Sequence, residues 1–163
     1  MAGRNRVCGL LLALVLAWAP LFAQESSSPS IRDQISELLR RVEQGDLSAD
    51  WDLAFELEAL GPQGVEILAR DAGTYSPKAR LVVARVLLGT QDQAALELLR
   101  NLVLDSQGAM PVRVAAAELL AVKGRGRQDA AGLEDLLNRP EDPFVKIAVA
   151  RAVWTLGRNR EAT

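Results

Sequence analysis

The 163-residue sequence has no histidine and a single cysteine, Cys8. Histidine is the commonest general acid or base and the commonest metal ligand, so its absence removes both roles. Removal of the segment that holds Cys8 would also exclude thiolate catalysis, zinc–thiolate sites and disulfides. No GxxxxGK(S/T), GxGxxG or GxSxG stretch occurs. We therefore expect a non-catalytic protein with no cofactor and no metal ion, because an enzyme would have to work with carboxylates alone.

Aromatic residues are scarce as well, at 4% of the chain, although 49% of its residues are apolar. Sheets and sandwich cores normally draw on more Val, Ile, Tyr, Phe and Trp than this. Ala, Leu, Arg and Glu, which are strong helix formers, are abundant instead. The composition therefore predicts an all-α fold, and the length suits one domain of ordinary size.

The sequence has no large excess of one charge, with a formal net charge of −2. Residues 24–75 hold 4 basic and 11 acidic side chains, whereas residues 76–163 hold 13 basic and 10 acidic ones. This asymmetry either steers a charged partner at low salt or is ordinary solvated surface. It excludes the concentrated basic face of a nucleic-acid-binding protein.

The N-terminal segment has the layout of a secretory signal peptide. Arg4 and Arg6 precede an apolar run over residues 7–19, and Ala23 is a small residue that suits cleavage. The run is shorter than the roughly 20 apolar residues that span a bilayer, although an uncleaved membrane anchor stays open. We expect a signal peptide over residues 1–23, a polar linker over 24–30, and no stable membrane span after cleavage. Export to a bacterial periplasm or secretion follows, the bacterial host being favoured because the mature chain lacks cysteine and an N-x-S/T sequon.

Residues 31–60 have the pattern of a first helical hairpin. Ser30 followed by Asp33 resembles a capping box, and Gly45 is a typical helix end. Apolar residues recur at helical spacing at Ile31, Ile35, Leu38, Leu39 and Val42. A second helix is expected over residues 48–60.

A 33-residue period governs the rest of the chain. Ala79, Val112 and Val145 are anchors of three similar segments, and a cation follows each anchor, at Arg80, Arg113 and Lys146. Offsets 0, 3, 4, 7 and 8 from each anchor are apolar in all three copies, and offset 5 is always alanine. A proline lies one or two residues before each anchor, and Gly89, Gly124 and Gly157 mark the expected helix ends.

This period predicts helical hairpins over residues 61–89, 91–124 and 128–157, in addition to the one over 31–60. One hairpin cannot cover its own apolar face, so neighbouring hairpins stack. Alanine at the seam lets helix backbones approach closely without a cost in side-chain entropy. The predicted architecture is therefore an α-α superhelix, a short solenoid that forms one repeat domain over residues 31–163.

The proline, the apolar anchor, the cation, the alanine four residues after that cation and the terminal glycine together resemble the HEAT-like repeats of bacterial and phycobilisome-lyase-related proteins. The resemblance covers about residues 46–157. It implies an armadillo-like scaffold that binds proteins, without a shared catalytic motif. It also implies that Arg80, Arg113 and Lys146 form an internal ladder with acids or carbonyls of the adjoining repeat.

Two charged clusters have both a functional and a structural interpretation. Asp46, Asp50, Asp52, Glu56 and Glu58 form either a site for a divalent cation or basic ligand, or a solvated acidic face, and they lack the spacing of a calcium loop. The basic stretch over residues 123–127, with Arg125 and Arg127, either contacts an acidic partner or lipid headgroups, or simply turns the chain beside a helix C-terminus.

The last predicted helix is apolar nearly all round, since Ile147, Ala150 and Trp154 lie off its periodic stripe. End repeats of solenoids normally present a polar outer face. We predict that Ile147 and Trp154 form a surface that meets a partner or a second copy of the chain. In the competing interpretation, Trp154 folds back over the preceding hairpin.

The function expected from the sequence is an exported, non-catalytic protein-protein interaction scaffold. Its partner is another protein, or a second copy through the C-terminal helix, and not nucleic acid. The alternative is an accessory or chaperone-like subunit of an enzyme complex, which would need a deep, partly polar pocket.

Overall fold

The computed structural model describes residues 29–45, 50–90 and 93–158. The predicted signal peptide over residues 1–23, most of the predicted linker and Asp46 lie outside these ranges. Those predictions therefore stay untested by the structure.

The described part of the chain is helical and contains no strand, so the predicted all-α class is confirmed. No helix within it is long and apolar enough to cross a membrane. Eight α-helices and two short 3₁₀ helices follow one another: α2 (Ile31–Gln44), α3 (Asp50–Glu58), α4 (Gly61–Asp71), η2 (Ala72–Thr74), α5 (Pro77–Gly89), α6 (Gln93–Leu104), α7 (Met110–Lys123), η3 (Arg127–Ala130), α8 (Leu133–Leu137) and α9 (Pro143–Arg158).

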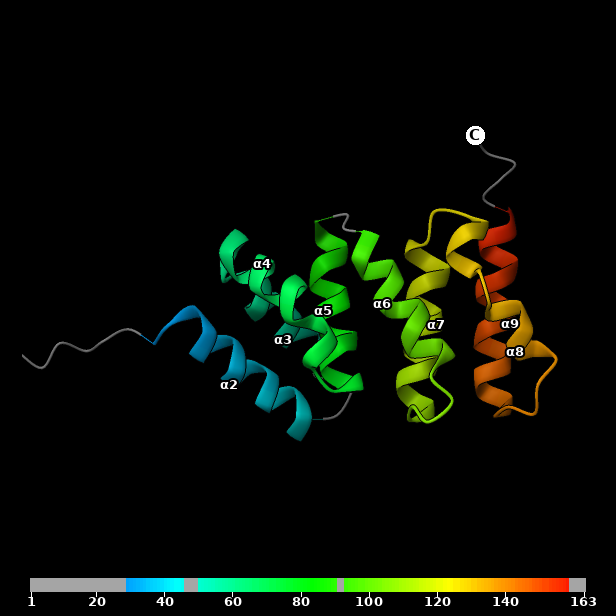
Figure 1. Ribbon diagram of the computed structural model, residues 1–163, viewed down its shortest axis with the longest axis horizontal. Helices are drawn as coiled ribbons and strands as arrows, with labels where there is room; N and C mark the ends of the chain where they lie inside the picture. Colours follow the sequence, from blue (N-terminus) through cyan, green and yellow to red (C-terminus); the bar gives the residue numbers. More distant parts are fainter. Residues whose placement is uncertain (1–28, 46–49, 91–92, 159–163) are drawn as a thin grey trace, which may run out of the picture.

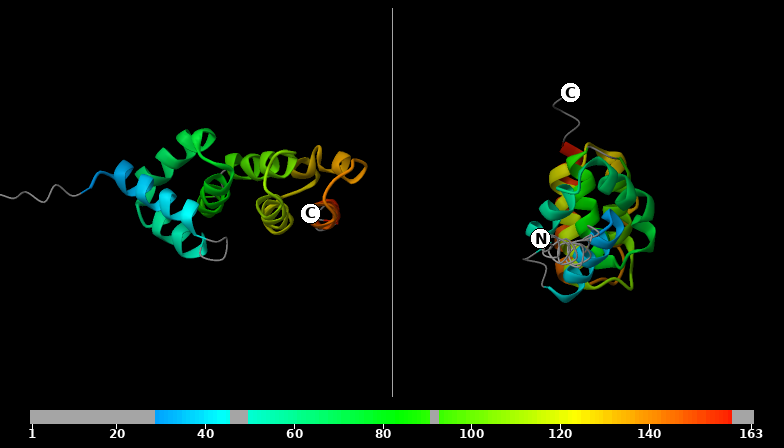
Figure 2. Two further views of the ribbon diagram at one scale, coloured as in Figure 1. Left: turned by 90° about the horizontal axis from the view of Figure 1, so that it is seen from below. Right: turned by 90° about the vertical axis from the view of Figure 1, so that its left-hand side faces the viewer.

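Along the long axis of the molecule, α2 lies at one end, α8 and α9 lie together at the other, and α5, α6 and α7 follow one another between them (Figure 1). Helices that are close in the sequence also make the main contacts, such as α5 with α6, α6 with α7, and α7 with α9. From below, α5, α7 and α9 lie in one row, with α6 and α8 in a second row (Figure 2).

Two hydrophobic cores meet at α5 and α6. One core joins α2 to α5, and the other joins α6 to α9. Helix α5 contributes to both, since Val82 and Val83 lie in the first core while Leu81 and Ala84 lie in the second. Leu88 and Leu98 are partly buried against both cores. The small apolar residues of α5 therefore connect the two halves of the molecule.

The periodic positions of the sequence form these cores. Of the fifteen apolar positions at the repeated offsets, twelve are buried, and Ala115, Leu119 and Val153 are partly buried against the second core. The predicted stripe of α2 is likewise buried at Ile35, Leu38, Leu39 and Val42. Helical periodicity therefore located the core, because one face of each helix is removed from water.

The predicted beginning and end of α2 are confirmed. The Ser30 hydroxyl accepts a hydrogen bond from the backbone N–H of Asp33 at 3.2 Å, and the Ser30 N–H donates to Asp33 Oδ2 at 3.2 Å. This reciprocal pair is a capping box. At the other end, the Gly45 N–H donates to the Arg41 carbonyl at 2.9 Å.

Two details of the expected helices are wrong. Gly157 does not end α9, which continues to Arg158; a glycine inside a helix costs only about 1 kcal/mol. The expected Leu-rich helix before α9 is interrupted, because Gly132 adopts a left-handed φ of 81° and leaves only the five residues of α8.

Candidate interaction surface

Arg113, in the first turn of α7, links this helix to the end of α6 and to the loop between α8 and α9. Its Nε donates to the Val103 carbonyl near the end of α6 at 3.0 Å. Its Nη1 and Nη2 donate to Glu141 Oε1 and Oε2 at 2.8 and 2.7 Å, and Glu141 lies in the loop between α8 and α9. The two side chains are only 4% and 14% exposed. This bidentate pair fixes the start of the last repeat against α7.

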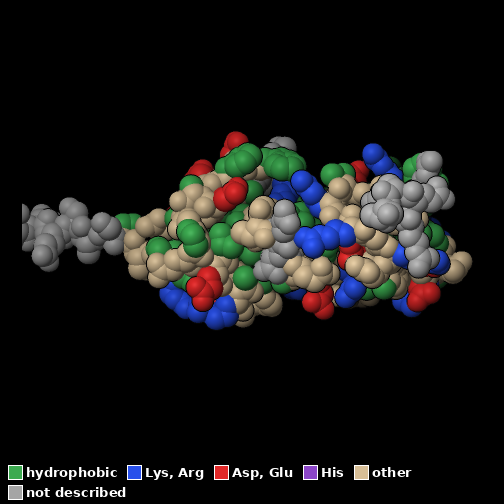
Figure 3. Space-filling model, turned by 90° about the horizontal axis from the view of Figure 1, so that it is seen from above, with side chains coloured by type: hydrophobic (Ala, Val, Ile, Leu, Met, Phe, Trp, Pro, Cys, Tyr) green, Lys and Arg blue, Asp and Glu red, His purple; other side chains and the backbone are tan. Residues whose placement is uncertain are grey.

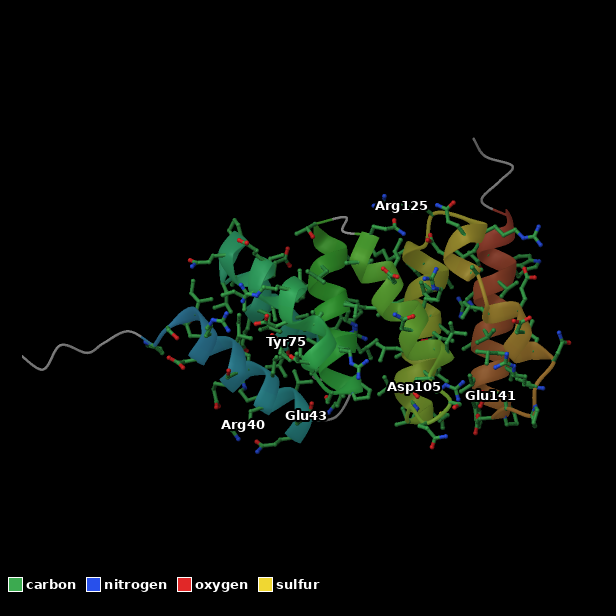
Figure 4. All side chains as sticks on the ribbon, in the orientation of Figure 1. Arg40, Glu43, Tyr75, Asp105, Arg125 and Glu141 are labelled. Atoms are coloured by element: carbon green, nitrogen blue, oxygen red, sulfur yellow. The ribbon has the colours of Figure 1, made fainter. Side chains whose placement is uncertain are left out.

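Glu141 is held in its ionised form at this junction. The hydrogen bonds from Arg113 lower the pKa of the Glu141 carboxyl, against the opposing effect of burial, and the Asp142 N–H and the charge of Lys146 lower it further. The arrangement is therefore a structural ion pair without proton-transfer character. Figure 4 shows Glu141 and Asp105 at one edge of the molecule and Arg125 at the opposite edge.

The other two cations of the predicted ladder have different surroundings. Arg80 Nε donates to the Tyr75 carbonyl at 2.8 Å, within its own hairpin. Glu141 lies four residues before the anchor Val145, and the equivalent position before Val112 is Gly108, which offers Arg80 no carboxylate. Lys146 lies in the last of the described helices, α9, and no ion pair of Lys146 is found among the described residues. The structure therefore shows the bidentate inter-repeat pair at Arg113 and not at Arg80.

The acidic residues of α3 do not converge on a cation site. Glu56 accepts hydrogen bonds from Arg41 Nη1 and Nη2, at 2.7 and 3.2 Å. This ion pair links α2 to α3. The hydrogen bonds that Arg41 donates to Glu56 raise the pKa of Arg41. No group of three potential metal ligands is found in the described ranges. The geometry of Glu56 therefore favours the structural interpretation of this acidic segment.

A hollow of about 430 Å³, which the sequence did not predict, lies between α2 and α3. Its apolar lining includes Leu38 and Leu60, and its acidic residues are Asp33, Glu37 and Glu56. Two of these acids are paired with arginine: Glu56 with Arg41, and Glu37 with Arg40 at 2.6 Å. No open acidic site remains at Glu37 or Glu56.

Aromatic side chains are exposed on α3. Trp51 and Phe55 are 53% and 63% exposed. Arg85 of α5 lies over the Trp51 ring, with its Cζ 4.4 Å from the ring centroid, which is a cation–π geometry. From above, hydrophobic side chains gather over α3 and α5, with Lys and Arg side chains beside them (Figure 3).

A hydrogen bond and an ion pair hold the basic turn that follows α7. The Arg125 backbone N–H donates to Oδ2 of the buried Asp129 at 2.6 Å, and Arg127 Nη2 lies 3.6 Å from Glu134. Both arginine residues are exposed. Arg125 lies on the turn between α7 and η3, and Arg127 is the first residue of η3, so the structure does not place them on the same helix as Ile147 and Trp154.

Ile147 and Trp154 share one exposed face of α9. They are 68% and 62% exposed, and Phe144, which the sequence reasoning missed, is 65% exposed on the same side. Trp154 is therefore not buried, although its face of α9 adjoins the packed part of the molecule. Phe144 is three residues before Ile147, so helical spacing alone could have revealed it.

This exposed face occupies positions that are packed in the earlier repeats. Offsets 2, 5 and 9 from the anchors give Leu81, Ala84 and Leu88 in α5, and Val114, Ala117 and Ala121 in α7; all six are buried or partly buried. In α9 the same offsets give Ile147, Ala150 and Trp154, and all three are exposed. In α9, the described chain thus exposes a helix face whose equivalents in α5 and α7 are covered by neighbouring helices.

Searches of known protein families, of characterised proteins and of solved structures find no match to this chain. The HEAT-like resemblance therefore stays a prediction from the repeated residues.

Proposed function

We propose that this chain is an exported, non-catalytic scaffold that binds another protein and is built as a short α-α superhelix of HEAT-like hairpins. The observation that carries the proposal is the outward face of α9. Three large apolar side chains on it are each more than 60% exposed. Exposed apolar side chains that adjoin one another mark sites of association, whereas single ones are ordinary.

The row formed by α5, α7 and α9 supports the superhelix (Figure 2). Three anchors 33 residues apart place equivalent apolar offsets against the core in α5, α7 and α9. The Arg113–Glu141 pair joins one proposed repeat to the next. Export rests on the residue pattern of positions 1–23.

The ionisable groups favour binding over catalysis. Where the described carboxyl groups have a shifted pKa, at Glu37, Asp71 and Glu141, hydrogen bonds from an arginine lower it. A carboxyl general acid at neutral pH needs the opposite shift, which burial in apolar surroundings would supply. Glu141 and Asp71 also pair with an arginine of another helix, Arg113 and Arg32 respectively, whereas Glu37 pairs with Arg40 inside α2.

Photo-crosslinking in the producing cells tests the proposal. A benzophenone amino acid at position 147 should give protein adducts on irradiation. The matched control carries it at the exposed Asn101 of α6, which lies outside the α9 face. Adducts at 147 that exceed those at 101 support the scaffold; equal or absent adducts at 147 contradict it.

A further inference from the structure

A groove of about 520 Å³ lies where α4 meets the C-terminal ends of α3 and α5. Its apolar lining comes from one face of α4, since Pro62, Val65 and Ala69 follow one another at helical spacing. Two exposed carboxylates also line it, that of Glu66 on the same helix and that of Glu58 at the end of α3. This α4 groove therefore combines an apolar surface with two acidic groups.

The two carboxylates of the α4 groove form no ion pair within the described ranges. Arg70 follows Glu66 by one turn, but it pairs with Asp71 at 2.8 Å. Glu58 lies against the last turn of α5, because a Cβ on Gly89 would be 3.3 Å from Glu58 Oε1. The α4 groove therefore differs from the hollow between α2 and α3, where arginines pair with two of the acids.

The backbone at the α4 groove adds to its negative potential. Helix α3 ends at Glu58 and α5 ends at Gly89, and the C-terminal end of a helix carries a partial negative charge. The last turn of neither helix contains a basic residue. The Thr90 hydroxyl, which also lines the groove, donates to the Leu87 carbonyl at 2.7 Å, so its oxygen is a further acceptor. Glu58 thus adds a full negative charge to two partial ones, an arrangement that a bound cation would stabilise.

A lysine or arginine side chain of a partner matches both properties of the groove. Its aliphatic stem can cover the apolar face of α4 while its charged end stays at the carboxylates and in contact with water. A metal ion matches less well, because it would gain nothing from the apolar lining, and no group of three potential metal ligands occurs in the described part of the chain. The excess of acidic side chains in residues 24–75, 11 against 4 basic ones, also attracts a basic partner from a distance.

We propose that the α4 groove binds a basic segment of another polypeptide, with the stem of a lysine or arginine side chain on α4 and its charge at Glu58 and Glu66. Both carboxylates are exposed, so the binding is modest in strength and weakens as salt is added. This site is separate from the outward face of α9, which carries the proposed function. Crosslinking at position 147 therefore does not depend on the α4 groove, and either proposal can fail while the other stands.

NMR titration of the isotope-labelled protein with short peptides tests this site. With a peptide of alternating leucine and lysine, we expect saturable shifts of the amide signals of Gly61 and Thr90, which line the groove. The same peptide with glutamate in place of lysine should cause no shift at these signals. A third peptide with diaminopropionic acid in place of lysine keeps the charge on a shorter stem, and it should bind more weakly. Binding of the glutamate peptide at these signals, or equal binding of the lysine and diaminopropionic acid peptides, overturns the proposal.

Two variants of equal charge distinguish the α4 groove from general attraction to an acidic protein. Glu58→Gln with Glu66→Gln should weaken the lysine peptide about tenfold, because each exposed ion pair contributes a factor of a few. Glu134→Gln with Asp135→Asn removes two exposed acids of α8, at the other end of the molecule (Figure 1), and should leave the affinity unchanged. An equal loss in both variants would mean that net charge alone attracts the peptide. Unchanged affinity in the groove variant would mean that the peptide binds elsewhere, and either result overturns the proposal.

Discussion

Replacement of Arg113 by methionine tests whether one buried guanidinium holds the last repeat in place. Arg113 is 3% exposed and makes three hydrogen bonds of 2.7–3.0 Å, two to Glu141 and one to the Val103 carbonyl. Methionine fills similar volume but leaves the Glu141 carboxylate, which is 14% exposed, without its cation. Removal of one partner of a buried pair costs about 3–5 kcal/mol. Because Glu141 keeps some contact with water, we expect about 3 kcal/mol, near the lower limit.

Urea unfolding followed by circular dichroism at 222 nm measures this loss. With an m-value of about 2 kcal/mol/M for a chain of this size, the midpoint should fall by about 1.5 M. Arg40→Met is the matched control: Arg40 makes a bidentate pair with Glu37, but both side chains are more than half exposed. Water replaces an exposed pair readily, so the control should leave the midpoint unchanged.

A double variant separates a lost ion pair from lost packing. Arg113→Met with Glu141→Leu removes both charges, so no carboxylate stays without its cation, and at least half of the lost stability should return. The reasoning is refuted if Arg113→Met unfolds at the same midpoint as Arg40→Met. It is also refuted if the double variant loses the sum of the two single effects.

Three further perturbations follow from the described contacts. Gly124→Ala should destabilise the protein by about 1–3 kcal/mol, since a Cβ there would lie 2.4 Å from Leu156 Cδ2; Gly126→Ala, with open space around it, is the control, and equal urea midpoints would contradict the packing argument. The pKa of Glu141 is lowered in the folded protein, so its stabilising effect is complete above the unfolded value of about 4.3 and is lost as the pH falls through the folded value. Urea titrations from pH 7 to about pH 3 should therefore show a smaller acid loss in Glu141→Gln than in the parent, and parallel curves would exclude this linkage. Ser30→Ala should cost about 1 kcal/mol by removing the capping box of α2, and an unchanged thermal midpoint would show that the cap contributes nothing.

The sequence pattern correctly predicted the features that depend on residues a few positions apart, namely the buried helix faces and one helix cap. The fifteen repeated offsets gave the core of α5, α7 and α9, and Ser30 with Asp33 gave the start of α2, since burial and capping depend on residues a few positions apart. The break before α8 was not predicted, because it depends on whether Gly132 adopts a positive φ, and sequence patterns allow both conformations.

Contacts that join separate segments were only partly predictable. The cation at Arg113 was expected to pair with the adjoining repeat, but its acid, Glu141, lies 28 residues away in a loop outside the repeated pattern. Arg80 follows its anchor in the same way and lacks the pair, because Gly108 takes the place of the acid. A repeat pattern therefore predicts which side chains point toward a neighbour, whereas the residue that the neighbour supplies decides the bond.

The same offsets have different surroundings in α9 than in α5 and α7. In α5 and α7, neighbouring helices cover the small residue at offset 5 and the apolar residues at offsets 2 and 9. These side chains are therefore wholly or partly removed from water. At α9 these offsets carry Ile147, Ala150 and Trp154 with no following helix in the described chain, and each exposed apolar side chain loses the burial energy that its equivalents gain. Polar residues at 147 and 154 would remove that cost if the face met only water. Covering the face of α9 would therefore supply the burial energy that its exposed apolar side chains lack.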